Sequence, residues 1–334
     1  MIYDLELRSY AKNTNPIKLL DYLASSFKYK SEEEWIAAIA EGLVDINGQT
    51  AVAGDKIQKD DLVVYTVKNY EEPDIEAWYN KLWENENIAV IEKPADLPVS
   101  SGNRFYKQNL INLVREGEDN PTISPIHRLD RETSGLIVFL KKQFSERSIK
   151  ENLSSILDNK VYLAIVEGNF KHDVYMLQTK LENCEKPPIP YKTVISEMGK
   201  DAATVFCKLA STKDYSLLAV KLLTGRKHQI RAHAAHLGYP IVGDKLYGKT
   251  EGKYLLKRKE NDILTEVDYQ ELGARTHMLH AVHLEVLLPS EDRLSFDSKC
   301  WSDEFSNYLS LFAPWEEKLQ KFIESSEFTV CEKY

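Results

Sequence analysis

Residues His127-Arg128-Leu129-Asp130-Arg131-Glu132-Thr133-Ser134-Gly135 run directly into the apolar segment Leu136-Ile137-Val138-Phe139-Leu140. The apolar segment has the length and composition of a buried strand. The nine residues before it carry more polar and charged side chains than a turn requires, and Ser134-Gly135 lets the chain bend sharply into the strand. We therefore expect Asp130 at the mouth of the strand, facing a cleft. The alternative is a polar loop in which an Arg–Asp pair is only a structural brace.

The bulk composition describes an ordinary globular protein. With 334 residues, 43% hydrophobic and 28% charged, the chain has room for about two domains. Its four cysteines are scattered with no C-x-x-C pair, which indicates neither a disulfide framework nor a zinc site and suits a reducing compartment. The sequence starts without a basic head and apolar stretch, and no apolar run is long enough to cross a bilayer. We expect a cytoplasmic protein without a membrane partner.

The net charge of −9 argues against a general nucleic-acid binder, but the charge is unevenly distributed. Residues 1–75 hold 14 acidic and 8 basic residues, whereas residues 76–334 hold 38 acidic and 35 basic ones. Residues 245–259 carry six basic residues and one acidic residue. The lysines of this basic segment recur every four residues, on one face if the segment is helical: Lys249, Lys253 and Lys257.

The first 75 residues predict a small α/β module. Residues 17–44 have helical periodicity in two apolar stripes, and an Asn47-Gly48 pair then indicates a tight hairpin. The stripes are Ile17, Leu20, Leu23 and Ala24, followed by Ile36, Ile39, Ala40 and Leu43. This helix–helix–hairpin order with the pattern GLVDINGQ…GD resembles the S4-like RNA-binding module. The second helix opens with three glutamates, where an RNA-binding face would have lysine or arginine; these acids also suit the helix dipole.

A polar, proline-containing linker over residues 69–80 separates this module from a larger core. In that core, strands are expected at 88–91, 136–140, 160–168, 204–209, 217–222 and 278–286, and helices at 104–116, 141–157 and from 226 onward. Residues 186–190 read as a loop, and 301–328 as an amphipathic helical extension. We divide the chain into domains 1–75 and 76–296 and a C-terminal extension, 297–334.

The second dense motif spans residues 222–240, LLTGRKHQIRAHAAHLGYP. Ile230, Ala234 and Leu237 recur at helical spacing, and Gly238 followed by Pro240 ends the helix. The opposite face carries His228 and Arg231.

The motifs of three common catalytic sites are absent: a zinc site, a phosphate-binding loop and a serine nucleophile. Histidines cluster at 228–236 and 277–283, but no carboxylate stands at the spacing of a zinc motif. No glycine-rich phosphate loop and no GxSxG element is present. What remains is one aspartate among arginines. Such a carboxylate stays ionised at neutral pH and can act as a nucleophile or a base.

Four motifs together resemble the RluA-type pseudouridine synthases: HRLDRETSGLIVF, KVYLAIVEG, LLTGRKHQIRAHAAHLGYPIVGDKLYG and MLHAVHLEV. Their order and spacing agree over roughly residues 85–290. The resemblance implies an α+β fold with a mixed, largely antiparallel sheet, flanking helices and a cleft across the sheet, preceded by the S4-like module. It also implies isomerisation of uridine to pseudouridine in structured RNA without a cofactor or a metal. Ribosomal and transfer RNA are both substrates of the family, and we expect ribosomal RNA, bound by a monomer.

The resemblance assigns a role to each matched residue. Asp130 is the catalytic aspartate, Tyr162 stacks on the flipped base and helps the C5 proton leave, and Arg231 pairs with Asp130. Arg128 enters the RNA stack in place of the uridine, since a stacked base hides its glycosidic bond. Further RNA contacts are expected from the two basic motifs, at Arg226, Lys227, His228, Lys249, Lys253 and Lys257.

One position departs from the family pattern. The first motif usually reads KPAGLPV, and here Asp96 replaces its glycine. Aspartate tolerates a positive φ better than most residues, so we expect the turn to persist. A second hypothesis is a catalytically silent RNA-binding or RNA-chaperone protein of the same fold. The retention of Asp130, Tyr162 and Arg231 argues for the enzyme.

Overall fold

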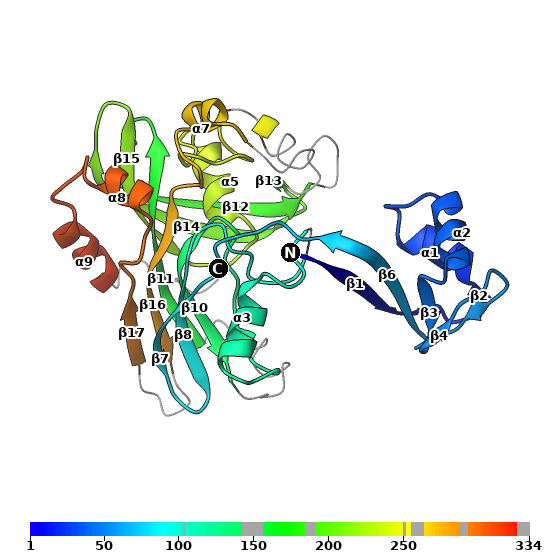
Figure 1. Ribbon diagram of the computed structural model, residues 1–334. Helices are drawn as coiled ribbons and strands as arrows, with labels where there is room; N and C mark the ends of the chain where they lie inside the picture. The colour runs from blue at the N-terminus through cyan, green and yellow to red at the C-terminus, as the bar shows by residue number, and fades with distance from the viewer. Residues whose placement is uncertain are drawn as a thin grey trace. The chain divides into compact units, whose positions relative to one another are not determined.

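The computed structural model describes residues 1–102, 104–141, 156–184, 192–249, 252–254, 264–287 and 293–325. The chain forms two compact units, Met1–Asp74 and Ile75–Tyr334 (Figure 1). None of the described helices is long and apolar enough to cross a bilayer. Most of the helix expected over 141–157, and the loop expected over 186–190, lie outside the described residues.

The first unit is a four-stranded antiparallel sheet that shares its core with two helices. Across the sheet the strands are β1 (Ile2–Tyr10), β6 (Leu62–Glu71), β3 (Val44–Ile46) and β4 (Gln49–Thr50). A separate short pair is β2 (Ile17–Lys18) with β5 (Lys56–Ile57). The helices are α1 (Leu19–Ser26) and α2 (Glu32–Ala40).

The expected apolar stripe of α2 is partly wrong. Ile36 is 47% exposed, whereas Trp35 and Ile39 are buried. Trp35 decides which face turns inward, because its large ring packs edge-on against Tyr65 with centroids 5.0 Å apart. The first of the two stripes is largely confirmed: Leu23 is buried, and Ile17 and Leu20 pack half-buried against the same core. Leu19 is buried there as well.

Two local expectations in the first unit are confirmed. Asn47 and Gly48 both have positive φ (52° and 82°), as a tight hairpin with an Asn-Gly turn requires. At the start of α2, the Ser31 side chain accepts a hydrogen bond from Glu34 N, and the Glu34 carboxylate accepts one from Ser31 N at 2.6 Å. Glu34 therefore has a structural role as part of a capping box.

The second unit is built on one eleven-stranded sheet (Figure 1). The path across it is β13 (Thr193–Ile195), β12 (Val174–Asn183), β14 (Lys200–Ser211), β15 (Tyr215–Leu222), β11 (Leu157–Glu167), β16 (Leu279–Leu287), β10 (Ser134–Leu140), β8 (Ile88–Lys93) and β7 (Asn80–Glu84). Two short strands join it, β9 (Ser124–Pro125) beside β10 and β17 (Arg293–Asp297) beside β16. Among the described strands, β10 and β16 are the one parallel pair, so the expected mixed, largely antiparallel sheet is confirmed.

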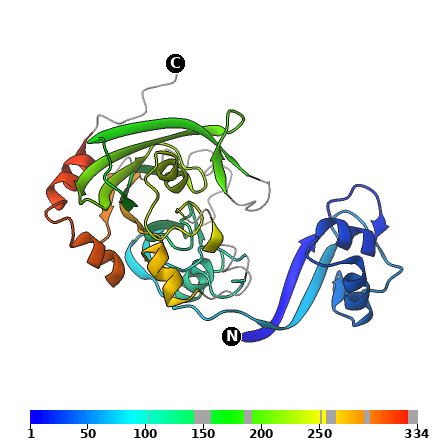
Figure 2. The ribbon, with the colours of Figure 1, turned by 90° about the horizontal axis from the view of Figure 1, so that it is seen from above.

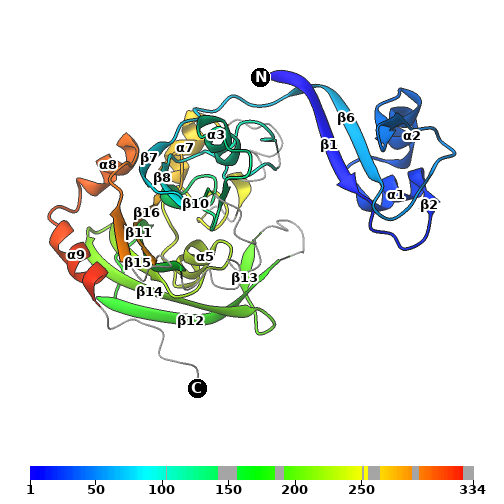
Figure 3. The ribbon, with the colours of Figure 1, turned by 90° about the horizontal axis from the view of Figure 1, so that it is seen from below.

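Five described helices flank this sheet: α3 (Leu110–Gly117), α5 (Gln229–His236), α7 (Glu266–Leu272), α8 (Asp303–Leu309) and α9 (Glu316–Glu324). Figures 2 and 3 show β12 and β14 as a curved wall with α5 on its inner side. The predicted C-terminal extension consists of α8 and α9, whose apolar side chains join the main core of the second unit.

The apolar segment that follows Asp130 is the interior strand β10, between β16 and β8. Ile137 and Phe139 pack into one core, and Leu136 and Val138 pack into a second core on the opposite face. Burial on both faces explains why this strand is a continuous apolar run rather than an alternating one. The strand thereby fixes the polar loop that precedes it beside the start of β16.

Candidate active site

A glycine contact and a buried lysine hold the loop that carries Asp130. Gly135 pairs with Ala281 on β16 at φ 105°, and a Cβ there would lie 2.2 Å from Ala281 O, so only glycine fits. Lys93 is fully buried and donates to three backbone carbonyls, including Arg131 O at 2.9 Å. Burial lowers the pKa of Lys93 to about 7. These contacts fix the entry of the chain into β10.

Asp96, which replaces the glycine of the family motif KPAGLPV, forms the expected turn. Its φ is 62°, so the positive-φ turn persists with aspartate in place of glycine. Its side chain also pairs with Arg131, Nε to Oδ1 at 2.9 Å, and the Arg131 guanidinium lies 4.2 Å from the centre of the Phe105 ring. The substitution adds a brace between the first motif and the loop of Asp130.

Asp130 and Arg231 meet although 101 residues separate them. Arg231 Nη1 donates to Asp130 Oδ2 at 2.7 Å. The remaining edge of the guanidinium binds Asp244 in two bonds, Nε to Oδ2 at 2.7 Å and Nη2 to Oδ1 at 2.9 Å. Asp244 is fully buried and also accepts from Leu246 N and Tyr247 N. A bidentate pair of this kind fixes the guanidinium in position and orientation.

The electrostatics keep the Asp130 carboxylate ionised. Burial raises the pKa of Asp130, but the Arg231 guanidinium, with smaller contributions from His228 and His277, outweighs it and lowers the value to about 2. The Asp130 side chain is still 26% exposed, whereas that of Arg231 is 10% exposed. The site therefore presents a charged, accessible carboxylate on a buried support, and within the described part of the chain its Oδ1 accepts no hydrogen bond.

Tyr162 lies on β11, beside the strand that contacts the Asp130 loop. It is 7% exposed and pairs with Ala281 in the sheet, the residue that also contacts Gly135. Burial, and next the negative charge of Asp130, raise the pKa of the Tyr162 phenol. The phenol is consequently protonated at neutral pH and lies within electrostatic range of the carboxylate.

A buried ionic cluster lies near Asp130, and the sequence did not predict it. Lys245 pairs with Glu132 at 2.9 Å and donates to Arg275 O at 2.6 Å. Glu132 also accepts from His277 N, and the His277 ring bonds Thr133 Oγ1 at 2.7 Å. Lys245 is 3% exposed, so the first lysine of the basic segment is a structural residue. The run of charges in residues 130–133 was the available signal for this cluster.

Two further histidines of these clusters, His233 and His280, bind hydroxyl groups. His233 contacts Thr179 and Thr204, and His280 contacts Ser134 and Ser298. Burial lowers the pKa of His233 to about 4 and that of His280 to about 3. These rings are neutral core elements that tie strands together.

Three of the expected RNA contacts are exposed side chains, and one of them, Lys227, lies within electrostatic range of Asp130. Arg128 and Lys227 are exposed. Burial lowers the pKa of Lys227; the charge of Asp130 opposes this effect, and the cations Arg128 and Arg231 add to it. Arg226 is exposed, and its Nε donates to Asp201 O at 2.8 Å. His228 is different: it is half-buried, and its Nε2 lies 3.6 Å from Asp130 Oδ1.

In the described part of the basic segment, Lys249 and Lys253 do not share a helix. Lys249 lies in a turn and pairs with Glu167, and Lys253 begins a short helical stretch 3.8 Å from Glu271. Lys257 lies outside the described residues. The Lys249 and Lys253 side chains are 75% and 63% exposed, so their ion pairs are weak and exchange easily for phosphate contacts.

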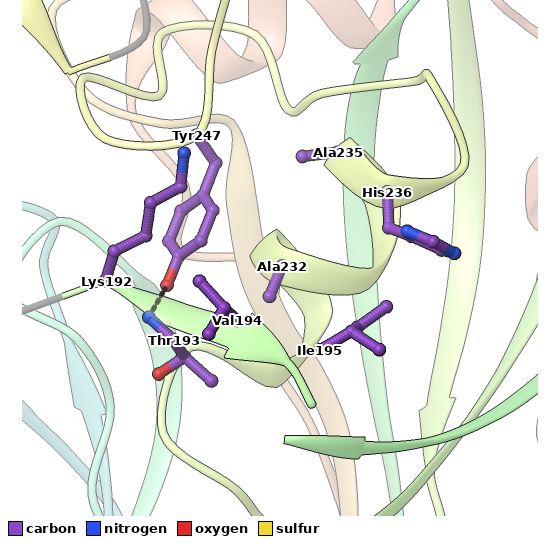
Figure 4. A pocket seen from close by; sticks show the side chains of 8 residues that line it. All are labelled: Lys192, Thr193, Val194, Ile195, Ala232, Ala235, His236 and Tyr247. Carbon is purple, nitrogen blue, oxygen red and sulfur yellow. Dashed lines mark hydrogen bonds between the residues drawn. The ribbon is translucent and has the colours of Figure 1, made fainter. Parts of the chain in front are cut away.

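A pocket of about 490 Å³ adjoins the site on the other side of Tyr247 (Figure 4). Strand β13 and helix α5 form its walls, with Lys192 and His236 as its ionisable groups besides Tyr247. Tyr247 also lies under Arg231, 5.1 Å from ring centre to guanidinium carbon. Its hydroxyl accepts a hydrogen bond from Thr193 N at 2.7 Å.

Comparisons with known proteins agree on one family. The family model described as RNA pseudouridylate synthase matches residues 87–236. A tRNA pseudouridine(31) synthase of Saccharomyces cerevisiae is 30% identical over 281 residues, covering 71% of this chain and 68% of that protein. A mitochondrial tRNA pseudouridine(32) synthase of the same yeast is 32% identical over 282 residues, covering 82% of this chain and 60% of that protein. The chain thus spans less than two thirds of this second relative.

The solved structure of human RNA Pseudouridylate Synthase Domain Containing 1 has the same fold, with a TM-score of 0.57 at 19% identity. The match covers 77% of this chain and 98% of that one. With this sheet, the paired Asp130 and Arg231, and these relatives, the chain belongs to the RNA pseudouridylate synthase family, whose members are RNA isomerases.

Proposed function

We propose that this protein isomerises specific uridines in structured RNA to pseudouridine, with Asp130 as the catalytic carboxylate. The observation that carries the proposal is the Asp130–Arg231–Asp244 chain. It supplies an ionised carboxylate, anchored through one oxygen and accessible through the other. An aspartate that was only a brace would have no need of an exposed side, or of a buried second aspartate behind its arginine.

The reaction needs only groups of the kind that this site holds. The N1–C1′ bond of uridine breaks, a C5–C1′ bond forms, C5 loses a proton and N1 gains one, so that substrate and product have the same atoms and oxidation state. Asp130 Oδ1 attacks C1′ or takes a proton, and both roles require the ionised form. Tyr162 contacts the base as a protonated phenol, so it has to lose its own proton before it accepts one from C5.

The uridine must leave its stack before Asp130 can reach the glycosidic bond. Arg128 is exposed on the loop of Asp130, and its planar, charged head is suited to replace a base in the stack. Lys227 and Arg226 lie on the neighbouring motif and are suited to hold phosphates on either side of the flipped nucleotide. We assign Lys249, Lys253 and Lys257 to more distant phosphates.

The names of the relatives bear on the substrate. Both yeast relatives are named as tRNA pseudouridine synthases. Transfer RNA therefore replaces ribosomal RNA as the first substrate to test. The S4-like identity of residues 1–75 stays a proposal supported by the order of two helices and a hairpin. The monomeric state stays a proposal. The cytoplasmic location also stays a proposal, since one relative is named as mitochondrial.

Tritium release from [5-³H]uridine-labelled RNA tests the activity, because C5 loses its hydrogen in the reaction. We expect release from unmodified transfer RNA with the wild-type chain and with Asp214→Asn, which changes an exposed aspartate of the same unit. Release should be absent with Asp130→Asn. Tight RNA binding by the wild-type chain with no release from transfer or ribosomal RNA would support the catalytically silent RNA-binding protein instead.

A further inference from the structure

His228 has a backbone conformation that side chains rarely adopt. Its φ is 54° in the left-handed region, immediately before α5 begins at Gln229. A non-glycine residue persists in this conformation only where its surroundings impose it. In this conformation the imidazole lies between Asp130 and Tyr247.

The contacts of the ring select one tautomer. His228 Nδ1 lies 3.0 Å from the Tyr247 hydroxyl, which already accepts a hydrogen bond from Thr193 N (Figure 4). The hydroxyl has a single hydrogen, and donating it to Nδ1 satisfies all three groups. The neutral ring then carries its own hydrogen on Nε2.

This Nε2 faces the reactive end of Asp130. Arg231 binds Oδ2 at 2.7 Å, while His228 Nε2 lies 3.6 Å from Oδ1. Burial lowers the pKa of His228 to about 4; the charge of Asp130 opposes this effect, and Arg231 and Lys227 add to it. The ring is therefore neutral at physiological pH. A cation here would pair tightly with Oδ1 and reduce its reactivity, whereas a neutral donor orients the oxygen without neutralising it.

We propose that His228, held as the Nε2–H tautomer by Tyr247, is a positioning residue that donates to Oδ1 of Asp130 and aims this oxygen at the flipped uridine. The assignment rests on the proposed function and replaces the RNA contact expected from the sequence. The 3.6 Å separation exceeds hydrogen-bond length, and contacts of this kind shorten when substrate closes the site.

Single-turnover kinetics at saturating RNA separate positioning from RNA binding. His228→Ala should lower the rate about 10–100-fold, the usual cost of removing a group that orients a reacting one, with RNA affinity within twofold. His228→Gln keeps an N–H donor and should recover part of the rate. His236→Ala, an exposed position on the same helix, is the matched control and should behave as wild type. An unchanged rate with weaker RNA binding would make His228 an RNA contact and overturn the proposal.

A second measurement does not depend on activity. In ¹⁵N-histidine NMR spectra of the RNA-free wild-type chain at pH 7, assigned with His228→Gln, we expect a neutral ring protonated on Nε2. Tyr247→Phe keeps the aromatic ring but removes the hydroxyl, and should shift the tautomer toward Nδ1. A ring protonated on Nδ1, or a cationic ring, would refute the positioning role even in an active enzyme. Absence of pseudouridine formation by the wild type would instead refute the proposed function.

Discussion

The charges behind Asp130 and those of the basic segment differ in burial and in how firmly partners hold them. Behind Asp130, the buried charges are held by partners: Arg231 lies between two aspartates, and Asp244 accepts four hydrogen bonds. Among the described residues of the basic segment, Lys249 and Lys253 each pair with one carboxylate and are mostly exposed. Buried charges lose hydration and are stable only in a fixed geometry, whereas exposed ones stay adaptable. The first set is suited to chemistry, and the second to an RNA backbone of variable path.

The largest effect is expected where this fixed geometry carries the reaction. Asp130→Asn preserves the shape of the side chain but can neither attack C1′ nor take a proton. We expect the single-turnover rate of pseudouridine formation to fall by at least about 10⁴-fold while RNA affinity stays within a few-fold. Turnover within about tenfold of wild type would mean that another group does the chemistry.

Removing the buried anchor should affect both stability and activity. Asp244→Asn leaves Arg231 without its bidentate partner, and breaking a buried pair costs about 3–5 kcal/mol of unfolding free energy, measured by denaturant titration. The rate should fall about 10–100-fold because Asp130 loses its orientation. Glu317→Gln, which removes an exposed ion pair with Lys321, should leave the unfolding midpoint unchanged. Equal effects of the two variants would erase the contrast between buried and exposed charges.

The same buried pairs set the acid stability of the fold. The folded-state pKa values of Asp130 and Asp244 lie below the ordinary aspartate value of about 4, so folding favours their charged forms. Their stabilisation is therefore complete above about pH 4 and is lost as the pH falls toward about 2. In Asp244→Asn, stability measured from pH 6 to pH 3 should decline less steeply than in wild type.

Tyr162→Phe keeps the ring and removes the hydroxyl. We expect near-normal folding and RNA binding with a strongly reduced rate, by about 10–100-fold, if the phenol takes part in proton transfer. Tyr239→Phe, at a ring that packs against Phe170, is the control for loss of a tyrosine hydroxyl elsewhere in the core. A Tyr162→Phe variant that loses stability and not rate would be a packing residue.

The smallest effect per residue is expected in the basic segment. Changing Lys249, Lys253 and Lys257 together to Glu should weaken RNA binding at least about tenfold, and each lost phosphate contact should lower the salt slope by about one. The same change at three exposed lysines of the acidic first unit should do less: Lys12, Lys18 and Lys28. A larger loss from the second set would make the first unit the main RNA contact.

Local chemistry accounts for the parts of the fold that the sequence could predict. The Asn47-Gly48 turn, the positive φ at Asp96 and the double burial of β10 follow from residue type and apolar pattern. The contact of Asp130 with Arg231 came from the resemblance, since nothing local links positions 101 residues apart.

The parts that were missed depend on tertiary packing. Asp244 had no assigned role, because its partner lies on the preceding helix and only the fold turns it inward. Lys245 looked like part of a phosphate-binding segment, but Glu132, 113 residues away, buries and neutralises it. In strand β1, the apolar residues Tyr3, Leu5 and Leu7 alternate with charged ones. This period-2 pattern predicts a strand, which the sequence analysis did not include.

Pseudouridine mapping of total RNA tests the central claim most directly, using cells that carry the wild-type gene, no gene, or the Asp130→Asn gene. The proposed function predicts one or a few uridines, in transfer RNA first, that are converted only with the wild-type gene. Restoration of the same sites by Asp130→Asn would contradict the catalytic role of this carboxylate, and an identical map in all three strains would contradict the proposed activity.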